Sequence, residues 1–235
     1  MILANPPFGK KGGYTIVGDD GKISTEKQEY ERDEFWATTS NKQLNFLQHI
    51  VSELKIGGTA AVVLPDNVLF EGGAGETIRR QLLKRCNVHT LLRLPTGIFY
   101  AQGVKANVLF FDRREASEDP WTKELWIYDL RTNQHFTLKT NPMKESDLKD
   151  FVKCYKAPTR ARRKEADRFK KFTYDEIVAR DKANLDIFWL KDESLEDTEN
   201  LPPPAELAAE IVESLEAALE EFRGVEEVLG KPDDG

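Results

Sequence analysis

Hydrophobic and polar positions follow two different periods along the first 115 residues, and the alternation predicts strands separated by helices. A short continuous apolar run such as Thr59–Leu64 is typical of a strand covered on both faces. Apolar residues every three or four positions, as from Leu44 to Leu54, indicate a helix that packs one face on a sheet. This succession predicts the doubly wound α/β class. The predicted strands cover residues 2–4, 59–64, 88–94 and 104–111, and the predicted helices cover residues 40–54 and 76–86.

The first predicted helix has signals at both ends. Ser40 and Gln43 have the spacing of a capping box, in which each side chain accepts the backbone N–H of the other residue. Gly57 and Gly58 are typical of the turn that ends a helix. We therefore expect this helix to begin at Ser40 and to end before Gly57.

Beyond residue 115 the pattern predicts one more strand, over residues 125–130, and a helix over residues 145–155. Eight Lys and Arg residues against two acidic residues then fill residues 156–171, with Phe169 and Phe172 near the end. Two interpretations stay open for this basic segment. It follows a DNA backbone through salt-dependent contacts, or it is a solvated linker. The basic residues are Lys156, Arg160, Arg162, Arg163, Lys164, Arg168, Lys170 and Lys171.

Charge is unevenly distributed along the chain. Residues 191–235 hold 15 Asp and Glu residues against 3 Lys and Arg residues, a net charge of −12. The other 190 residues hold 31 basic and 26 acidic side chains, so the total of −7 hides a mildly basic body. Within the acidic region, residues 201–230 predict an amphipathic helix whose apolar strip must be buried. The strip packs either on its own domain or on another subunit.

Composition disfavours metal, disulfide and membrane roles. Cys86 and Cys154 form neither a metal-binding spacing nor a disulfide framework, which favours a reducing cytoplasm. The three histidines, His49, His89 and His135, lie far apart, so we expect no metal site. No apolar run reaches the roughly 20 residues that cross a membrane. We therefore expect a cytoplasmic protein without a membrane segment.

The candidate chemistry lies where the first predicted strand ends, at Asn5-Pro6-Pro7-Phe8. Ligands of open α/β proteins bind at this edge of the sheet. A residue before proline is pushed into an extended conformation, and proline has a fixed φ and no N–H. The Asn5 side-chain oxygen and the Pro6 carbonyl are therefore rigid acceptors for both hydrogens of a planar NH2 group. Phe8 offers a face for ring stacking, worth about 1–3 kcal/mol per base. The alternative is an ordinary turn with Phe8 in the core.

A polar and glycine-rich stretch, residues 9–39, follows without clear periodicity. Its glycines and lysines lack the spacing of a nucleoside-triphosphate loop, which excludes that class of protein. A long loop beside a ligand-binding turn favours a lid or a binding loop. Lys10 and Lys11 contact DNA phosphates under this interpretation, and they are a solvated pair under the alternative.

Three stretches together resemble one known family. Asn5–Phe8 after an apolar strand is similar to the catalytic motif of amino-group methyltransferases that use S-adenosylmethionine. Residues 94–111 resemble the signature region of the DNA-methylating (modification) subunit of type I restriction–modification systems. Asn184-Leu185-Asp186-Ile187 resembles a short motif nearer the C-terminus of that subunit. The resemblance is strong over residues 1–115 and weaker beyond them.

The resemblance implies a site-specific DNA methyltransferase that moves a methyl group from S-adenosylmethionine to N6 of a flipped adenine. It places Asn5 beside the cofactor as well as the base. It also implies that the loop 95–103 forms part of the base pocket, although Phe99 could equally pack under the loop. The implied catalytic residues are Asn5, Pro6, Pro7 and Phe8, and the implied substrate-binding residues are Phe99, Tyr100, Lys10 and Lys11.

The implied partners are double-stranded DNA, a DNA-reading specificity subunit, docked in part by the C-terminal helical region, and a restriction subunit. In the family, the half of the sheet that precedes the catalytic turn carries the glycine-rich loop and the acidic residue that hold the cofactor. This sequence contains neither, so we expect the isolated chain to be inactive. We expect the catalytic half of the domain at 1–130, an extension and charged linker at 131–200, and a C-terminal helix at 201–230.

Two other functions stay open. One is a methyltransferase for another planar amino group, such as a glutamine amide or an RNA base. The other is a catalytically silent module for assembly and DNA binding. Without the strands that normally flank it, the first strand is an unprotected edge that can pair with another chain. We therefore expect residues 1–9 to be disordered or to pair between copies of the chain.

Overall fold

The computed structural model describes residues 1–8, 13–17, 23–27, 31–99, 104–134, 136–138 and 141–191, and the single residues 212 and 219. The chain divides into two compact units, Met1–Lys191 and Asp192–Gly235. In the second unit, Val212 and Leu219 are helical and about half exposed. The rest of the predicted helix at 201–230 lies outside the described residues.

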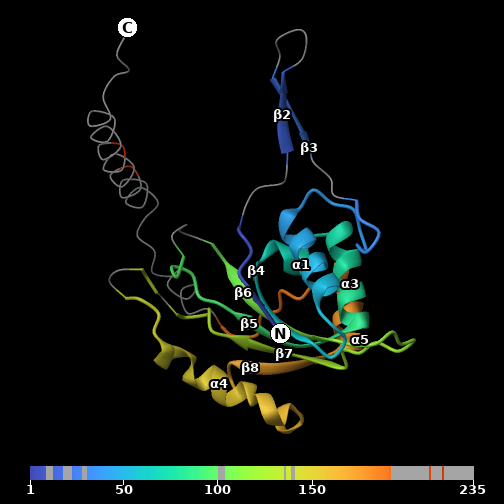
Figure 1. Ribbon diagram of the computed structural model, residues 1–235. Coiled ribbons are helices and arrows are strands. Elements are labelled where there is room, and N and C mark those ends of the chain that lie inside the picture. The colour runs from blue at the N-terminus through green and yellow to red at the C-terminus, as the bar shows by residue number, and fades with distance from the viewer. Residues whose placement is uncertain are drawn as a thin grey trace. The chain divides into compact units, whose positions relative to one another are not determined.

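A six-stranded sheet forms the centre of the first unit, in the order β1-β4-β6-β5-β7-β8 (Figure 1). β1 is parallel to β4 and β5 is parallel to β7, whereas β6 and β8 run antiparallel to their neighbours. A separate antiparallel hairpin consists of β2 (Gly13–Val17) and β3 (Ile23–Lys27). The strands of the main sheet are β1 (Ile2–Ala4), β4 (Thr59–Pro65), β5 (Cys86–Arg93), β6 (Ala106–Arg113), β7 (Glu124–Asp129) and β8 (Phe169–Thr173).

The predicted succession of strands and helices is present, but the sheet is mixed. β5 and β6 are adjacent and follow one another as a hairpin, so β6 runs against both of its neighbours. Two features were not predicted. The β2–β3 hairpin lies within the stretch expected to be a loop, and β8 lies within the basic segment.

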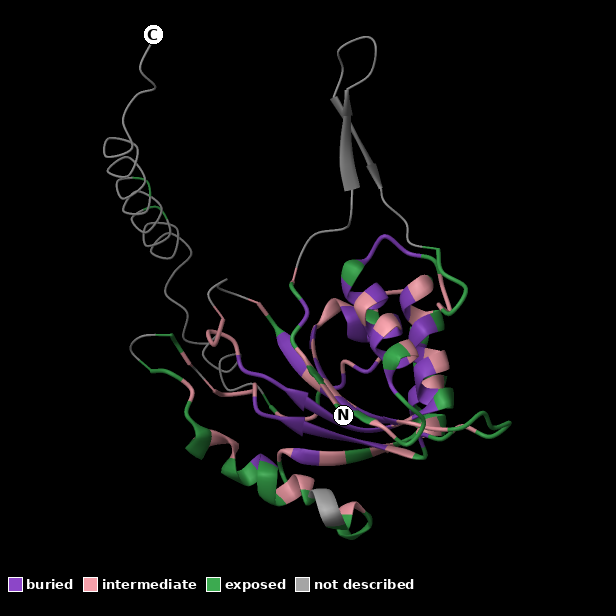
Figure 2. Ribbon diagram, viewed as in Figure 1, coloured by how far each residue is buried: buried purple, intermediate pink, exposed green. Residues whose placement is uncertain are grey.

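Helices cover both faces of the sheet (Figure 1). On one face, α1, α3 and α5 bury their apolar side chains against β4, β5 and β6. On the other face, Phe151 of α4 packs with Phe169 and Tyr128. The strands between these layers are largely buried (Figure 2). The helices are α1 (Lys42–Glu53), α2 (Asn67–Phe70), α3 (Ala74–Arg85), α4 (Lys149–Tyr155) and α5 (Tyr174–Ala179), with single 3-10 turns η1 (Glu145–Leu148), η2 (Ala157–Arg162) and η3 (Asp181–Ala183).

The cap of the first helix differs from the prediction. Asn41 is the N-cap of α1, and its side-chain oxygen accepts the backbone N–H groups of Gln43 and Leu44. The capping box expected between Ser40 and Gln43 is therefore wrong. Serine and asparagine cap helices about equally well, so the local sequence could not choose between neighbouring candidates.

The first strand is an edge of the sheet, as predicted. Among the described strands β1 pairs with β4 alone. Met1 is 85% exposed and Leu3 is 71% exposed, so the edge is uncovered. The expected disorder of residues 1–9 is wrong for residues 1–8, because Ile2–Ala4 forms β1, whereas pairing of this edge between copies of the chain stays a prediction.

Candidate functional site

The Asn5–Phe8 turn leaves β1 at the end of the sheet where β4 also ends, because the two strands are parallel and adjacent. The Asn5 side chain is exposed, whereas Pro6 is buried and anchors the turn. The Asn5 amide makes no hydrogen bond to the described residues, so it is not buried against its own backbone. An incoming NH2 group can therefore reach it.

Two of the predicted aromatic residues are brought together at this edge. The rings of Phe8 and Phe99 have centroids 5.6 Å apart and meet edge to face at 67°. Phe99 belongs to the loop between β5 and β6, so residues 91 positions apart in the sequence line the same spot. Both rings are partly exposed, and both also pack against the hydrophobic cluster that contains Leu94 and Ala106, so the alternative of packing on the core holds for part of each ring. Tyr100, Lys10 and Lys11 lie outside the described residues.

A cavity of about 410 Å³ lies beside the turn, and Pro7 forms part of its wall. Its other walls are aromatic and basic, and Asn5 is not among the lining residues. A larger cavity of about 630 Å³ lies at the opposite end of the strands, where β5 begins at Cys86 and β6 ends at Arg113. The larger cavity is therefore not part of the candidate site. The smaller one is lined by Pro7, Arg32, Phe35, Lys42, Asn45, Phe46 and His49.

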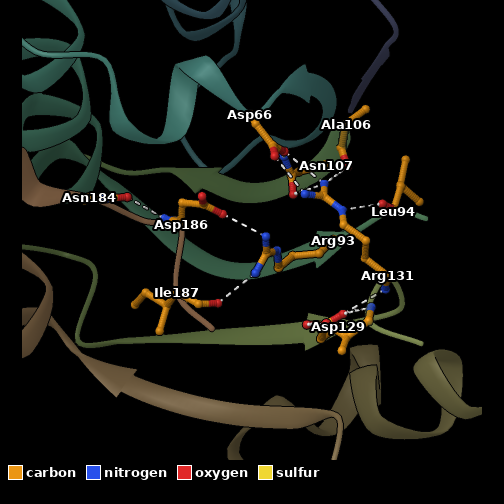
Figure 3. A network of polar contacts seen from close by, with 11 residues as sticks. Asp66, Arg93, Leu94, Ala106, Asn107, Asp129, Arg131, Asn184, Asp186 and Ile187 are labelled. Atoms are coloured by element: carbon orange, nitrogen blue, oxygen red, sulfur yellow. Dashed lines mark hydrogen bonds and ion pairs between the residues drawn. The ribbon is translucent and has the colours of Figure 1, made fainter. Parts of the chain in front are cut away.

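The strand beside β1 ends at Pro65, and the next residue, Asp66, lies in a network of polar contacts (Figure 3). Arg131 donates to both carboxylate oxygens of Asp66, at 2.7 and 2.9 Å, and Asn107 donates to one of them at 2.7 Å. Burial alone would raise the pKa of Asp66, but the hydrogen bonds and positive charge of Arg131 outweigh burial and lower it. Asp66 is therefore a carboxylate at neutral pH.

Arg93, the last residue of β5, connects this edge to a segment far along the chain. Its guanidinium is fully buried and donates to Oδ1 of Asp186 at 2.8 Å and to the carbonyl of Ile187 at 2.9 Å (Figure 3). The ring of Phe188 covers the guanidinium at 3.7 Å. The Asn184 side chain accepts the backbone N–H of Asp186 at 2.7 Å, which shapes the segment as an Asx turn. The motif at the C-terminal end of the resemblance therefore lies at the candidate site.

A second buried arginine holds the start of the same segment. Arg79 of α3 is 1% exposed and donates to the carbonyls of Lys182 and Ala183, at 2.6 and 3.2 Å. Both residues have left-handed φ values, +54° and +47°, which are uncommon outside glycine. Arg79 also donates to the carbonyls of Val68 and Glu71, after β4. One side chain thus binds the segment to the exit of the strand next to β1.

The basic segment, residues 156–171, is largely built into the fold. Arg160 donates to Asp112 at 2.8 Å, and Arg163 is buried and donates to the carbonyl of His89 at 3.0 Å. Three others with partners inside the chain are Arg168, Lys170 and Lys171. Three exposed residues without an ion pair in the described part of the chain are Lys156, Arg162 and Lys164.

Asp66, Arg93 and Arg131 of the network were not candidates from the sequence, whereas Asp186 belongs to the Asn184–Ile187 motif noted there. One signal could have found Arg93, because it is a charged residue in the run predicted as strand 88–94. Asp66 also follows a predicted strand directly, at the edge where ligands bind. Arg131 carries no such signal, because its partner Asp66 lies 65 positions away in the sequence.

The described residues offer no evident metal or thiol chemistry. No group of three or more His, Cys, Asp or Glu side chains in this part of the chain is placed to hold a metal ion. Burial raises the pKa of the Cys86 thiol to about 12, so it stays protonated. Over the same residues, the helices are too short or too polar to cross a bilayer.

Comparison with known proteins gives one consistent result. A profile of the N-6 DNA methylase family matches residues 1–195. The chain is 38% identical to the type I restriction enzyme EcoKI methylase subunit of Escherichia coli and 39% identical to the StySJI methylase subunit of Salmonella typhimurium. Each match covers 100% of this chain and 47% of the relative. The chain thus spans about half the length of these curated relatives.

Solved structures agree with the sequence comparison. The crystal structure of the EcoKI M protein superposes with a TM-score of 0.67 at 38% identity, over 100% of this chain and 51% of that one. A modification subunit of a type I restriction enzyme from Vibrio vulnificus gives a TM-score of 0.55 at 29% identity, over 75% of this chain and 34% of that one.

Proposed function

We propose a function from one premise: this chain belongs to the N-6 DNA methylase family, among the methylase subunits of type I restriction enzymes. In our proposal, it carries the residues that bind and orient the target adenine of a site-specific DNA methyltransferase. The methyl group goes to N6, the exocyclic amino nitrogen of that base. The observation that carries the proposal is the exposed amide of Asn5, free of hydrogen bonds to the described residues, at the edge that also holds the Phe8–Phe99 pair.

The chain's own residues supply the orientation. The adenine must leave the duplex to reach them, which costs a few kcal/mol. Phe8 and Phe99 then hold the ring. The Asn5 side-chain oxygen and the Pro6 carbonyl accept the two N–H groups, which favours a pyramidal nitrogen whose lone pair points at the methyl donor. As the new N–C bond forms, the nitrogen becomes positive, and these fixed acceptors stabilise it more than they stabilise the ground state. The extra proton leaves the nitrogen after the transfer, which gives the neutral methylated amine.

S-adenosylmethionine supplies the methyl group in this proposal. Asn5 fits such a group, because its side chain is exposed beside an uncovered edge strand where further contacts can be added. We assign no other residue of this chain to the cofactor. Since the chain spans 47% of the EcoKI methylase subunit, we propose that the remaining contacts come from outside the matched half.

We propose double-stranded DNA as the substrate, and a DNA-reading specificity subunit and a restriction subunit as partners in the cytoplasm. The relatives are named as subunits of type I restriction enzymes, which supports this assignment. A further solved structure has a TM-score of 0.61 at 27% identity. It is described as showing the structural basis of complex assembly in the type I restriction–modification system.

Asn5→Ala tests the proposal in the complete methylase subunit with its partners. We expect methylation of the target adenine to be lost, because one of the two acceptors is removed, while DNA binding stays close to that of the parent. Methyl transfer from radiolabelled S-adenosylmethionine and a filter-binding assay measure the two properties. A variant that turns over near the parent's rate would refute the assignment of Asn5.

A second candidate function is a catalytically silent module for assembly and DNA binding. The half-length match favours it for the isolated polypeptide. Titration calorimetry of the 235-residue chain with S-adenosylmethionine separates the two cases, because tight binding by this chain alone would exclude the silent module. Methyltransferases for a glutamine amide or an RNA base are disfavoured, since the relatives described above are subunits of DNA restriction enzymes.

A further inference from the structure

A backbone hydrogen bond joins the two residues that flank the loop carrying Phe99. We call residues 95–105 the base-pocket loop, and Leu94 and Ala106 its roots. The backbone N–H of Leu94 donates to the carbonyl of Ala106 at 3.0 Å. Phe99 lies 5.6 Å from Phe8, centroid to centroid. The spacing of the two rings therefore depends on what holds the roots.

One guanidinium holds both roots. Arg131, in the turn after β7, donates through Nε to the carbonyl of Leu94 at 2.8 Å and through Nη2 to the carbonyl of Ala106 at 2.9 Å (Figure 3). The same group donates to both carboxylate oxygens of Asp66, at 2.7 and 2.9 Å. Because Asp66 directly follows β4, and β4 pairs with β1, Arg131 connects the loop to the strand beside the Asn5–Phe8 turn.

The turn that carries Arg131 is itself held in place. Asp129 is fully buried and accepts the backbone N–H groups of Arg131 and Thr132, each at 2.8 Å. The same connection also touches the loop directly, because a Cβ at Gly97 would overlap the carbonyl oxygen of Phe136. Gly97 has a φ of +80°, so glycine is favoured here on both grounds. The described part of this loop, residues 95–99 and 104–105, is thus held at Leu94 and Ala106 and beside Gly97.

We propose that Arg131 is a positioning residue for the methylation reaction: it holds the base-pocket loop against the end of β4 so that Phe99 and Phe8 keep the edge-to-face arrangement that offers a ring face to a flipped base. This inference rests on the proposed function. Arginine suits the task because its planar fork has five N–H donors and reaches three separate acceptor groups at once. A lysine ammonium is a point charge and cannot bridge the two roots and Asp66 together.

The test compares Arg131→Lys with Arg113→Lys in the complete methylase assembled with its partner subunits. Arg113 is a matched control, because its Nη1 donates to the carbonyls of Val51, Ser52 and Leu54, at the end of β6 away from the loop. A duplex with 2-aminopurine in place of the target adenine reports base flipping by fluorescence. Methyl transfer to the normal duplex gives kcat and KM.

We expect Arg131→Lys to abolish most of the 2-aminopurine signal and to lower kcat by on the order of 100-fold, the scale seen when a reacting group is misplaced by about 1 Å. DNA affinity should stay near the parent's, because the duplex still docks. Arg113→Lys should keep both the fluorescence signal and kcat. A merely structural role for Arg131 would instead produce the same loss in both variants, and that result would overturn the proposal.

Hydrogen exchange of the Leu94 amide gives a check that does not depend on activity. This N–H should exchange faster in Arg131→Lys than in the parent and in Arg113→Lys, because its acceptor, the Ala106 carbonyl, is no longer held. Unchanged exchange of the Leu94 amide in Arg131→Lys would overturn the proposed role of Arg131 in holding the loop, even if kcat fell. If the parent itself neither flips nor methylates the adenine, the proposed function fails. The exchange result then tests only whether Arg131 holds the loop at Leu94 and Ala106. The two failures are therefore distinguishable.

Discussion

Arg79→Met is a direct test of how the segment at 182–187 is held at the site. Arg79 lies in α3, is 1% exposed, and donates to four backbone carbonyls. Methionine keeps an unbranched apolar stem in the same space and removes every donor. The variant therefore tests the hydrogen bonds with little change in packing.

The size of the effect follows from which carbonyls lose a partner. The bonds to Val68 and Ala183 are fully buried, whereas those to Glu71 and Lys182 are partly exposed and can be replaced by water. A hydrogen bond to a charged group contributes about 1.5–3 kcal/mol, so two buried ones contribute about 3–6 kcal/mol. Burial of the guanidinium opposes this and lowers the pKa of Arg79 to about 10. We therefore expect the free energy of unfolding to fall by about 3 kcal/mol, the lower end of that range.

Urea denaturation of the 235-residue chain measures the loss, and Arg80→Met is the matched control. Arg80 is the next residue of α3, is 41% exposed and pairs with Glu76 at 2.8 Å, so its replacement should cost less than about 1 kcal/mol. The Leu185 amide, which donates to the carbonyl of Leu69 at 2.9 Å, should also exchange faster in Arg79→Met. Equal losses in the two variants with unchanged Leu185 exchange would refute this reasoning.

Two further predictions concern charged groups. His89 and Arg160 outweigh the effect of burial on Asp112 and lower its pKa from 3.8 to about 2, so its carboxylate stabilises the fold above about pH 4, by about 2 kcal/mol. Asp112→Asn should lose that amount at pH 7, and urea titrations should show the difference shrinking as the pH falls from 4 towards 2; a constant difference would contradict it. The second prediction uses a triple alanine variant of the exposed basic residues, namely Lys156, Arg162 and Lys164. If they contact phosphates, the slope of log affinity against log salt falls by up to about 3 in the complete enzyme, and an unchanged slope removes the DNA role of this segment.

The elements of the sheet were predictable where the signal is local. The apolar run at 59–64 became β4, and the runs at 88–94 and 104–111 became β5 and β6 with shifts of about two residues at their ends. β8 was missed because its five residues, Phe169–Thr173, include two lysines, so the charge of the segment hid an alternation that buries Phe169. A high density of basic residues therefore does not identify a solvated segment, because the stems and head groups of these residues can pack inside the same chain.

The candidate site divides in the same way. The Asn5–Phe8 turn and Phe99 were identified from the sequence, and the structure places Phe8 and Phe99 in contact. The arginines that surround them were not identified, because each acts through a partner far away in the sequence. Arg93 and Asp186 are 93 positions apart, and Arg131 and Asp66 are 65 positions apart. No periodicity or spacing connects such pairs.

The sequence by itself determined the place of the Asn5–Phe8 turn and the succession of strands and helices, because both follow from local physics: the fixed φ of two prolines and the period of apolar side chains. Only the tertiary structure decided the strand order, in which β6 lies between β4 and β5, and the use made of each buried arginine. The physical reason is that a buried charge must be met by acceptors, and these come from whichever segments the packed sheet brings to it. The buried Arg79 and Arg93 and the partly buried Arg131 all meet theirs at the end of the sheet where the turn lies.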